Sequence, residues 1–381
     1  MVWNTTTRPT GFPFYVEKNY TNSTSSPSNS SAISCSESWI YETAFAVSLA
    51  LLMIAMIGVS VFGNSIVCYI VYQKPAMRSA INLLLASLAL ADVLTTLVCM
   101  PFAFLTIVTQ GWILGQEFCQ VNALLYSFLV TEATLVLVTI SIDRYLIIVR
   151  RKDTLTPQKA KIYIVVSWFV AFGMSVPPLF RWGKFAYVFD ELQCSLAYPS
   201  HPEIHLSYSL FYLSAAFLIP FVIMAYCYFW ILRTVRRNST RIQNHPPISS
   251  GMMTTKMHRP GRMDINYSFK TRAFTTILIL FLLFVVCCMP YTILRFYLVL
   301  RGPSTVTYKL SVLLLWLAYL NCTLKPVIYY VRISKFREAC TDILPSWCIH
   351  LPKCLPGRTM RRIRPHAIYE VDRRSIAVTS I

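Results

Sequence analysis

Seven long apolar segments constrain this chain more than any other feature of its sequence. A helix rises about 1.5 Å per residue, so about 20 residues cross the hydrocarbon core of a bilayer. Hydrophobic residues make up 55% of the chain and charged residues only 13%, a balance typical of membrane proteins. The sequence therefore predicts an all-α membrane protein, a bundle of seven transmembrane helices. The predicted spans cover roughly residues 43–72, 80–108, 121–149, 160–179, 206–232, 273–300 and 309–330.

Positive charge is distributed unevenly around these spans. The net charge is +19, and most of the 35 Lys and Arg residues follow the first, third, fifth and seventh spans. Because cytoplasmic loops are rich in Lys and Arg, the amino terminus is predicted outside and the carboxyl terminus in the cytoplasm, at the plasma membrane. The basic inner rim indicates anionic membrane lipids as partners and argues against nucleic acid.

Three regions follow along the chain. Residues 1–42 are polar and Ser/Asn-rich and are predicted to be a disordered extracellular arm. Residues 43–331 form the seven-span domain, and 332–381 form an amphipathic helix and a cytoplasmic tail. No apolar stretch suited to a cleavable signal follows Met1, so the first span is expected to direct membrane insertion. Predicted glycosylation sites are Asn4, Asn19, Asn22 and Asn29.

The segment after the seventh span predicts a short eighth helix lying on the inner leaflet. Its apolar residues recur at helical spacing from Ile333 to Leu344. Candidate palmitoylation sites are Cys340, Cys348 and Cys354, with Cys340 alternatively a small packing residue. The last residues, Thr379, Ser380 and Ile381, are a candidate ligand for a PDZ domain.

Few of the 12 cysteines lie on the predicted outer side. Cys119 begins the third span and Cys194 lies in the second outer loop, so these two are the predicted disulfide pair. Cys35 then remains without a partner, which leaves a buried thiol or an intermolecular bridge open.

The third span ends in Asp143-Arg144-Tyr145, followed by the basic residues 150–152. An Arg held at a membrane boundary by a neighbouring carboxylate can be released inward, which is the behaviour of a switch. The alternative is an interfacial ion pair that only anchors the helix. The switch interpretation indicates a receptor rather than an enzyme.

Further landmarks occur in order along the spans. They are Gly63-Asn64, Asp92, Trp168, Pro220, Tyr228, Cys288 with Pro290, and Lys325-Pro326 with Tyr329. With the outer cysteine and the Asp-Arg-Tyr sequence, this set resembles the rhodopsin-like (class A) G-protein-coupled receptors over residues 63–340. Residues 74–82 and 269–276 are further similar to the orphan receptors numbered forty-five and sixty-three, a group linked to lysophospholipid-type ligands.

The resemblance implies heterotrimeric G proteins as partners, arrestin as a candidate partner, and a set of switch residues. Arg144 is expected to face the bundle and to contact Tyr228 and the G protein once the sixth helix moves outward. Lys270 stands where many receptors place a carboxylate that restrains this Arg, so elevated basal signalling is expected. Alternatively, Lys270 only adds to the basic rim. The implied switch comprises Asp143, Arg144, Tyr145, Tyr228, Lys270, Pro326 and Tyr329.

A second implied site lies in the apolar middle of the bundle and comprises Asn64, Asp92, Asn321 and Lys325. In the family, the position of Asp92 binds sodium, and Ala133 stands here where a hydroxyl is usual. Lys325 replaces the usual Asn or Asp before Pro326. We expect its ammonium to take the place of sodium beside Asp92, with snorkelling to the cytoplasmic face as the alternative.

The outer halves of the spans hold the expected ligand pocket. Cys288 replaces the bulky Trp of the family, so the pocket floor is expected to be deeper or repacked with Phe284. Tyr126 stands where amine receptors have a carboxylate, and Tyr319 where opsins have the retinal-binding Lys. The predicted pocket residues are Tyr126, Tyr208, Tyr212, Cys288, Tyr291, Arg295 and Tyr319.

Positive charge near the pocket mouth suits an unidentified anionic or amphipathic extracellular or lipid ligand. The basic residues concerned are Arg181, Lys184, Arg295, Arg301 and Lys309. The alternative is that the Tyr and Trp residues form an ordinary interfacial belt. The Arg-Gln pair that some lysophospholipid receptors carry early in the third helix is replaced by Asn122-Ala123.

No cofactor, metal cluster or nucleophile–base pair is predicted, so the chain is not expected to be an enzyme. A transporter or proton-coupled channel is an alternative because Asp92, Glu132 and Lys325 are predicted within spans. No internal repeat supports it. A ligandless regulator of another receptor is a third possibility, suggested by Cys288 and Lys325.

Overall fold

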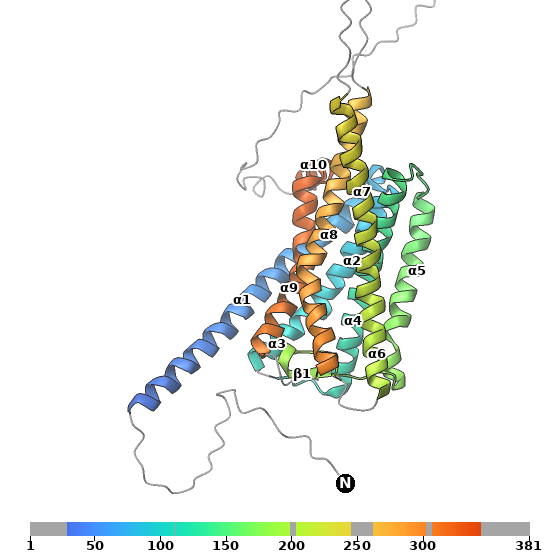
Figure 1. Ribbon diagram of the computed structural model, residues 1–381. Helices are drawn as coiled ribbons and strands as arrows, with labels where there is room; N and C mark the ends of the chain where they lie inside the picture. Colours follow the sequence, from blue (N-terminus) through green and yellow to red (C-terminus); the bar gives the residue numbers. More distant parts are fainter. Residues whose placement is uncertain (1–28, 110, 199–202, 245–261, 302–306, 344–381) are drawn as a thin grey trace, which may run out of the picture. The chain divides into compact units, whose positions relative to one another are not determined.

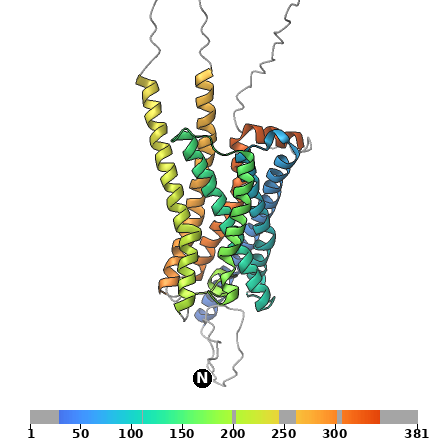
Figure 2. The same ribbon diagram turned by 90° about the vertical axis from the view of Figure 1, so that its right-hand side faces the viewer.

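The computed structural model describes residues 29–109, 111–198, 203–244, 262–301 and 307–343. Within these ranges only the backbone is described for 29–42, 203, 238–244, 262–273, 334–335 and 341–343. The chain divides into two units, Met1–Cys340 and Thr341–Ile381. The first unit contains a bundle of long helices (Figures 1 and 2).

Seven segments of the bundle are long and apolar enough to cross a membrane, as the sequence predicts. They are Thr43–Gln73, Ala80–Thr109, Gln116–Ile148, Pro157–Phe180, Ile204–Arg237, Phe274–Arg301 and Tyr308–Arg332. The largest differences from the predicted bounds are an earlier start of the third span and a later end of the fifth. Both extensions contain polar residues that a hydropathy pattern excludes, although a helix can continue beyond the hydrocarbon core.

Each long helix of the bundle packs against at least two others. The helices are α1 (Asn29–Gln73), α2 (Ala80–Val98), α3 (Met100–Thr109), α4 (Gln116–Ile148), α5 (Pro157–Ser175), α6 (Glu203–Leu213), α7 (Ile219–Asn244), α8 (Arg262–Arg301), α9 (Tyr308–Arg332) and α10 (Ser334–Ile343). Helix α4 lies against α2, α5 and α7, whereas α9 lies against α1 and α8. Helix α1 begins at Asn29, so it extends into the segment 1–42 that the sequence predicts to be a disordered arm. No Pro or Gly interrupts this helix before Gly58.

Prolines occur close to the irregular points of two spans. The second span divides into α2 and α3 at Cys99, shortly before Pro101, and the fifth contains a π-helical turn, Ser214–Leu218, just before Pro220. Proline lacks an N–H and its ring crowds the preceding turn, so the helix rearranges there. Helices α8 and α9 continue through Pro290 and Pro326.

Large apolar side chains cover much of the outer surface of the bundle. Phe169 is 75% exposed, and Phe62, Val286 and Ile293 are also exposed. Exposed apolar side chains on this scale would be costly in water, whereas lipid tails solvate them. The surface therefore agrees with membrane insertion of the spans.

A short hairpin covers one end of the bundle, which we call the disulfide end. Strand β1 (Phe185–Val188) pairs antiparallel with β2 (Gln193–Leu196), and a helical turn, Phe189–Glu191, joins them. The disulfide between Cys119 and Cys194 ties β2 to the first turn of α4, which is the predicted pairing. The opposite end, where α4 finishes, is called the Arg144 end.

Helix α10 follows α9 directly, where the sequence predicts the eighth helix. The ring centroid of Phe336 lies 6.3 Å from that of Tyr329, so the start of α10 packs on the end of α9. Cys340 is buried, and burial raises the pKa of its thiol to about 11. These properties favour the packing role for Cys340 over palmitoylation, which needs an accessible thiolate.

Candidate functional site

The middle of the bundle contains a buried ion pair. Nζ of Lys325 on α9 lies 2.9 Å from Oδ1 of Asp92 on α2, and each side chain is 1% exposed. A buried charge needs a partner of opposite sign, and here the ammonium and the carboxylate are partners for each other. The structure therefore places Lys325 beside Asp92 and not at the cytoplasmic face.

The two Asn residues of the predicted polar site lie near this pair without hydrogen-bonding to it. Nδ2 of Asn64 donates to the backbone oxygens of Ser60 and Cys322, which ties α1 to α9. Asn321 is buried, and its Oδ1 has no hydrogen-bond partner. Help from Asn64 for the Asp92 carboxylate was expected, but its amide is occupied by backbone carbonyls.

A small cavity lies directly above the ion pair, toward the disulfide end. Its volume is about 30 Å³, which is room for a water molecule or two. The walls include Asp92, Ala133, Phe284 and Cys288. The small side chains of Ala133 and Cys288, in place of a hydroxyl residue and an indole, leave this space open.

Arg295, one of the predicted pocket residues, is paired with a carboxylate of the hairpin at the disulfide end. Its side chain on α8 is buried, and Nη1 lies 2.6 Å from Oε1 of Glu191 in the loop between the strands. Nη2 donates to the backbone oxygen of Leu196, and Cζ lies 4.7 Å from the ring centroid of Tyr198. Sequence reasoning missed Glu191, although its position three residues before Cys194 puts it over the bundle.

The predicted pocket tyrosines separate into two groups. Tyr126, Tyr291 and Tyr319 line the small cavity together with Cys288. Tyr208 and Tyr212 instead donate from their hydroxyls to the backbone oxygens of Met174 and Ser127, at 3.0 Å each. Those two rings hold α6 against α5 and α4 and are not in the cavity wall.

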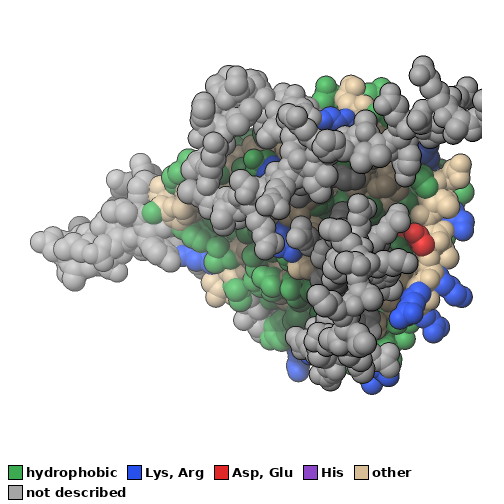
Figure 3. All heavy atoms as spheres, turned by 90° about the horizontal axis from the view of Figure 1, so that it is seen from above, with side chains coloured by type: hydrophobic (Ala, Val, Ile, Leu, Met, Phe, Trp, Pro, Cys, Tyr) green, Lys and Arg blue, Asp and Glu red, His purple; other side chains and the backbone are tan. Residues whose placement is uncertain are grey.

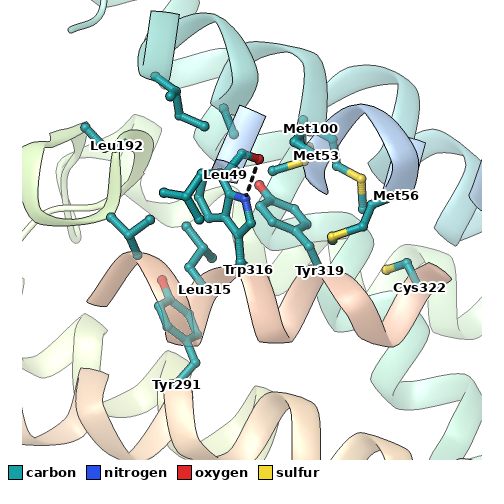
Figure 4. Packing of buried hydrophobic residues seen from close by; sticks show 14 residues of the cluster. Leu49, Met53, Met56, Met100, Leu192, Tyr291, Leu315, Trp316, Tyr319 and Cys322 are labelled. Atoms are coloured by element: carbon teal, nitrogen blue, oxygen red, sulfur yellow. Dashed lines mark hydrogen bonds between the residues drawn. The ribbon is translucent and has the colours of Figure 1, made fainter. Parts of the chain in front are cut away.

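The loop also contributes an apolar side chain to the core of the disulfide end. Leu192 belongs to a buried cluster with Tyr291, Trp316 and Tyr319 (Figure 4). Next to it, Oε1 of Gln193 accepts a hydrogen bond from the hydroxyl of Tyr319 at 2.7 Å. Leu192 and Gln193 were also absent from the residues predicted for the site, because nothing in a loop sequence indicates how deeply it inserts.

The position of Asn122 bears on the lysophospholipid resemblance. Its Nδ2 donates to the backbone oxygen of Val98 at 2.8 Å, which ties α4 to α2. Asn122 therefore has a structural contact where some lysophospholipid receptors carry an Arg.

At the Arg144 end, the switch residues are in a paired arrangement. Nε of Arg144 lies 2.9 Å from Oδ2 of Asp143, and Nη2 donates to the same oxygen. The hydroxyl of Tyr228 donates to the backbone oxygen of Ile277 on α8 at 3.1 Å. Arg144 thus binds its neighbouring carboxylate here, and the Tyr228 hydroxyl ties α7 to α8.

Two more predicted switch residues lie close to this end. The ring of Tyr145 lies 5.9 Å from that of Tyr226, and Tyr329 is buried. Figure 3 views the molecule from the Arg144 end and shows Lys and Arg side chains around the parts that are not grey. The side chain of Lys270 lies outside the described residues, so its role stays a prediction.

Glu132 does not continue a path of charged groups from Asp92. Its Oε1 accepts hydrogen bonds from Ser167 Oγ at 2.9 Å and from Ser87 Oγ at 3.3 Å. Asp92 and Lys325 meanwhile neutralise each other. Among the described residues, the three groups that prompted the transporter interpretation therefore form no proton relay.

Other predicted sites lie outside the part of the chain that the structure describes. They are the side chains at Asn4, Asn19, Asn22, Asn29 and Cys35, the candidate lipidation sites Cys348 and Cys354, and the terminal residues Thr379, Ser380 and Ile381.

Comparison with known proteins agrees with this architecture. Residues 63–329 match the family described as 7 transmembrane receptor (rhodopsin family). The chain is 44% identical over 346 residues to a protein of Xenopus laevis named high-affinity lysophosphatidic acid receptor, covering 89% of this chain and 92% of that one. It is 43% identical to the human probable G-protein coupled receptor 63, covering 85% of this chain and 78% of the relative.

A third relative and a solved structure extend the comparison. The human probable G-protein coupled receptor 45 is 41% identical, covering 87% of this chain and 91% of the relative. The crystal structure of squid rhodopsin shares the fold, with a TM-score of 0.69, 22% identity, and coverage of 82% of this chain and 88% of the other. The chain therefore belongs to the rhodopsin family of seven-transmembrane receptors, the class A G-protein-coupled receptors, which are not enzymes.

Proposed function

We propose that this receptor recognises an anionic amphiphile of the lysophosphatidate class and catalyses nucleotide exchange on a heterotrimeric G protein. The observation that carries the ligand class is the buried guanidinium of Arg295 within the outer half of the bundle. A guanidinium binds carboxylate and phosphate groups through parallel N–H donors. The Xenopus relative named as a lysophosphatidic acid receptor supports the same class.

The proposal places the disulfide end outside the cell and the Arg144 end in the cytoplasm. The distribution of Lys and Arg supports this orientation, because basic residues cluster after the first, third, fifth and seventh spans. Arg144 and Tyr228 would then face the G protein.

Nucleotide exchange in membranes containing the receptor and purified heterotrimeric G protein tests the proposal. Oleoyl lysophosphatidate should accelerate exchange, and the uncharged monooleoyl glycerol of equal chain length should not. Arg295→Met should abolish the response while leaving exchange without ligand measurable. Equal responses to the charged and uncharged lipids would contradict the anionic ligand class.

A second candidate is a receptor that signals without a diffusible ligand. The observation that favours it is that the loop segment Glu191 to Leu196 is itself buried at the disulfide end. This function predicts substantial exchange with no added lipid and no change when either lipid is supplied.

A further inference from the structure

The segment Glu191 to Leu196 of the second outer loop is buried along its whole length. Every one of its six side chains is at most 5% exposed. We propose that this segment is a tethered occupant of the ligand site, in which the Glu191 carboxylate stands in for the anionic group of the ligand. The inference rests on the proposed function and specifies how that same site is regulated.

The carboxylate of Glu191 occupies a complete anion-binding site. Arg295 donates from Nη1 to Oε1 at 2.6 Å, Tyr198 donates from its hydroxyl to Oε1 at 3.3 Å, and Ser195 donates from Oγ to Oε2 at 2.7 Å. Arg295 and Tyr198 lie outside the segment, and they can bind a carboxylate or phosphate oxygen of a ligand in the same way. A ligand anion therefore competes with Glu191 for one set of groups.

The next residue supplies an apolar group below the anion. Leu192 inserts into the cluster formed by Tyr291, Trp316 and Tyr319 (Figure 4). The loop thus presents an acid followed by a hydrocarbon group, the same order of chemistry as the head and tail of an anionic amphiphile.

Little space remains for a second occupant while the segment is in place. The cavity lined by Tyr126, Tyr291 and Tyr319 is about 30 Å³, which is far smaller than typical ligand pockets of about 300–1,000 Å³. An amphiphile must therefore displace the segment to bind. Leu192 has φ 51° and ψ 36°, a left-handed conformation that is unfavourable for a non-glycine residue.

The disulfide limits how far the segment can move. Cys194 stays bonded to Cys119 on α4, so the residues on either side can leave the site but remain close to it. The segment consequently acts at a high effective concentration, and the observed ligand affinity is lower than the intrinsic one.

Glu191→Gln tests the inference because it removes the internal anion and retains the shape of the side chain. We expect purified Glu191→Gln receptor to bind oleoyl lysophosphatidate about tenfold or more tightly than the natural receptor does. Monooleoyl glycerol must displace the same segment, so its affinity should rise less than that of the charged lipid, because it supplies no anion to Arg295. The matched control is Asp190→Asn, which removes the adjacent carboxylate without removing a hydrogen bond of the anion site and should change the affinity for the charged lipid much less than Glu191→Gln does.

Burial of an unpaired Arg295 could impair folding of the Glu191→Gln receptor. In that case oleoyl lysophosphatidate, and not the glycerol lipid, should restore its surface expression, since the ligand supplies the missing anion. The double variant Glu191→Met/Arg295→Met should fold and show no preference between the two lipids.

Distinct outcomes separate this inference from the proposed function. Equal affinity of the natural and Glu191→Gln receptors for the charged lipid would overturn the competition and leave the ligand class intact. Failure of both receptors to bind it would overturn the ligand class as well. Absence of rescue of a misfolded Glu191→Gln receptor by the charged lipid would also overturn the inference.

Discussion

At the residue scale, Asp92 pairs with a cation that is covalently attached to the chain, the ammonium of Lys325. The ammonium lies 2.9 Å from the carboxylate and cannot leave it as a free ion could. Breaking a buried pair leaves one uncompensated charge, which is more destabilising than removing both charges. Their coupling is therefore measurable by a double-mutant cycle.

We expect Asp92→Asn and Lys325→Met each to lower the free energy of unfolding by about 3–5 kcal/mol. The double variant should lose less unfolding free energy than either single variant, because it contains no unpaired buried charge. Thermal unfolding of purified receptor measures the series. Additive losses would show that the two groups do not interact, and a strong sodium dependence of the natural receptor's melting temperature would contradict replacement of sodium by Lys325.

Asp190 in the outer loop gives a prediction for pH dependence. Burial raises the pKa of its carboxyl, and the neighbouring Glu191 raises it further. The folded receptor therefore binds this proton more tightly than the unfolded chain, so stability from this group falls as pH rises from the ordinary Asp pKa through the raised value. Because Asp190 is only half-buried, solvent screening keeps the effect small.

The expected result is a melting temperature that decreases more between about pH 4 and pH 7 in the natural receptor than in Asp190→Asn. The difference between the two pH profiles cancels the contribution of groups that titrate in both proteins. Parallel pH profiles would show that Asp190 does not contribute.

At the scale of helices, close packing of α1 on α9 depends on one glycine. A Cβ built at Gly63 would lie 2.6 Å from Cγ and 2.7 Å from Cβ of Pro326, whose ring is rigid. Gly58 on the same helix has no atom within 4 Å of its built Cβ. The space beside Gly63 is therefore filled by Pro326, whereas the space beside Gly58 is open.

Gly63→Ala should separate α1 from α9 and lower the free energy of unfolding by about 1–3 kcal/mol, as overpacked sites do. Gly58→Ala is the control and should leave stability unchanged or raise it by up to about 1 kcal/mol, because Ala favours helix. Thermal melting of both variants measures the difference. Equal tolerance would mean that Pro326 can shift away.

At the scale of the whole molecule, each end of the bundle contains an Arg paired with a carboxylate. Arg144 pairs with Asp143 at one end, and Glu191 pairs with Arg295 at the other. The family's distant carboxylate restraint on this Arg is replaced by Lys270. The sequence places no carboxylate at this position to hold the inactive state, so basal exchange is predicted to be elevated.

Lys270→Glu should lower nucleotide exchange without ligand by about fivefold or more, which corresponds to a coupling of about 1 kcal/mol. Lys256→Glu makes the same change in net charge within the predicted third inner loop and serves as the control. Equal reductions by both variants would show that Lys270 acts only as part of the basic rim.

Apolar segment length and the positions of Lys and Arg were sufficient to predict seven helices and their order. These properties are local, because a chain in lipid must satisfy its backbone hydrogen bonds within each helix. The partners Cys119 and Cys194 were also predictable, since few cysteines lie in outer segments. The contact of Lys325 with Asp92 was expected from the family resemblance, with snorkelling of Lys325 as the alternative, because a buried charge needs a partner.

Only the tertiary structure decided what fills the disulfide end of the bundle. Glu191, Leu192 and Gln193 lie in a loop with no periodic pattern, and their burial depends on where the disulfide and the strands place them. Arg295 could be recognised from the sequence as a pocket residue, but its pairing with the Glu191 carboxylate could not. Electrostatic pairing depends on distances between residues far apart in the chain, here Arg295 and Glu191, and those distances exist only in the folded receptor.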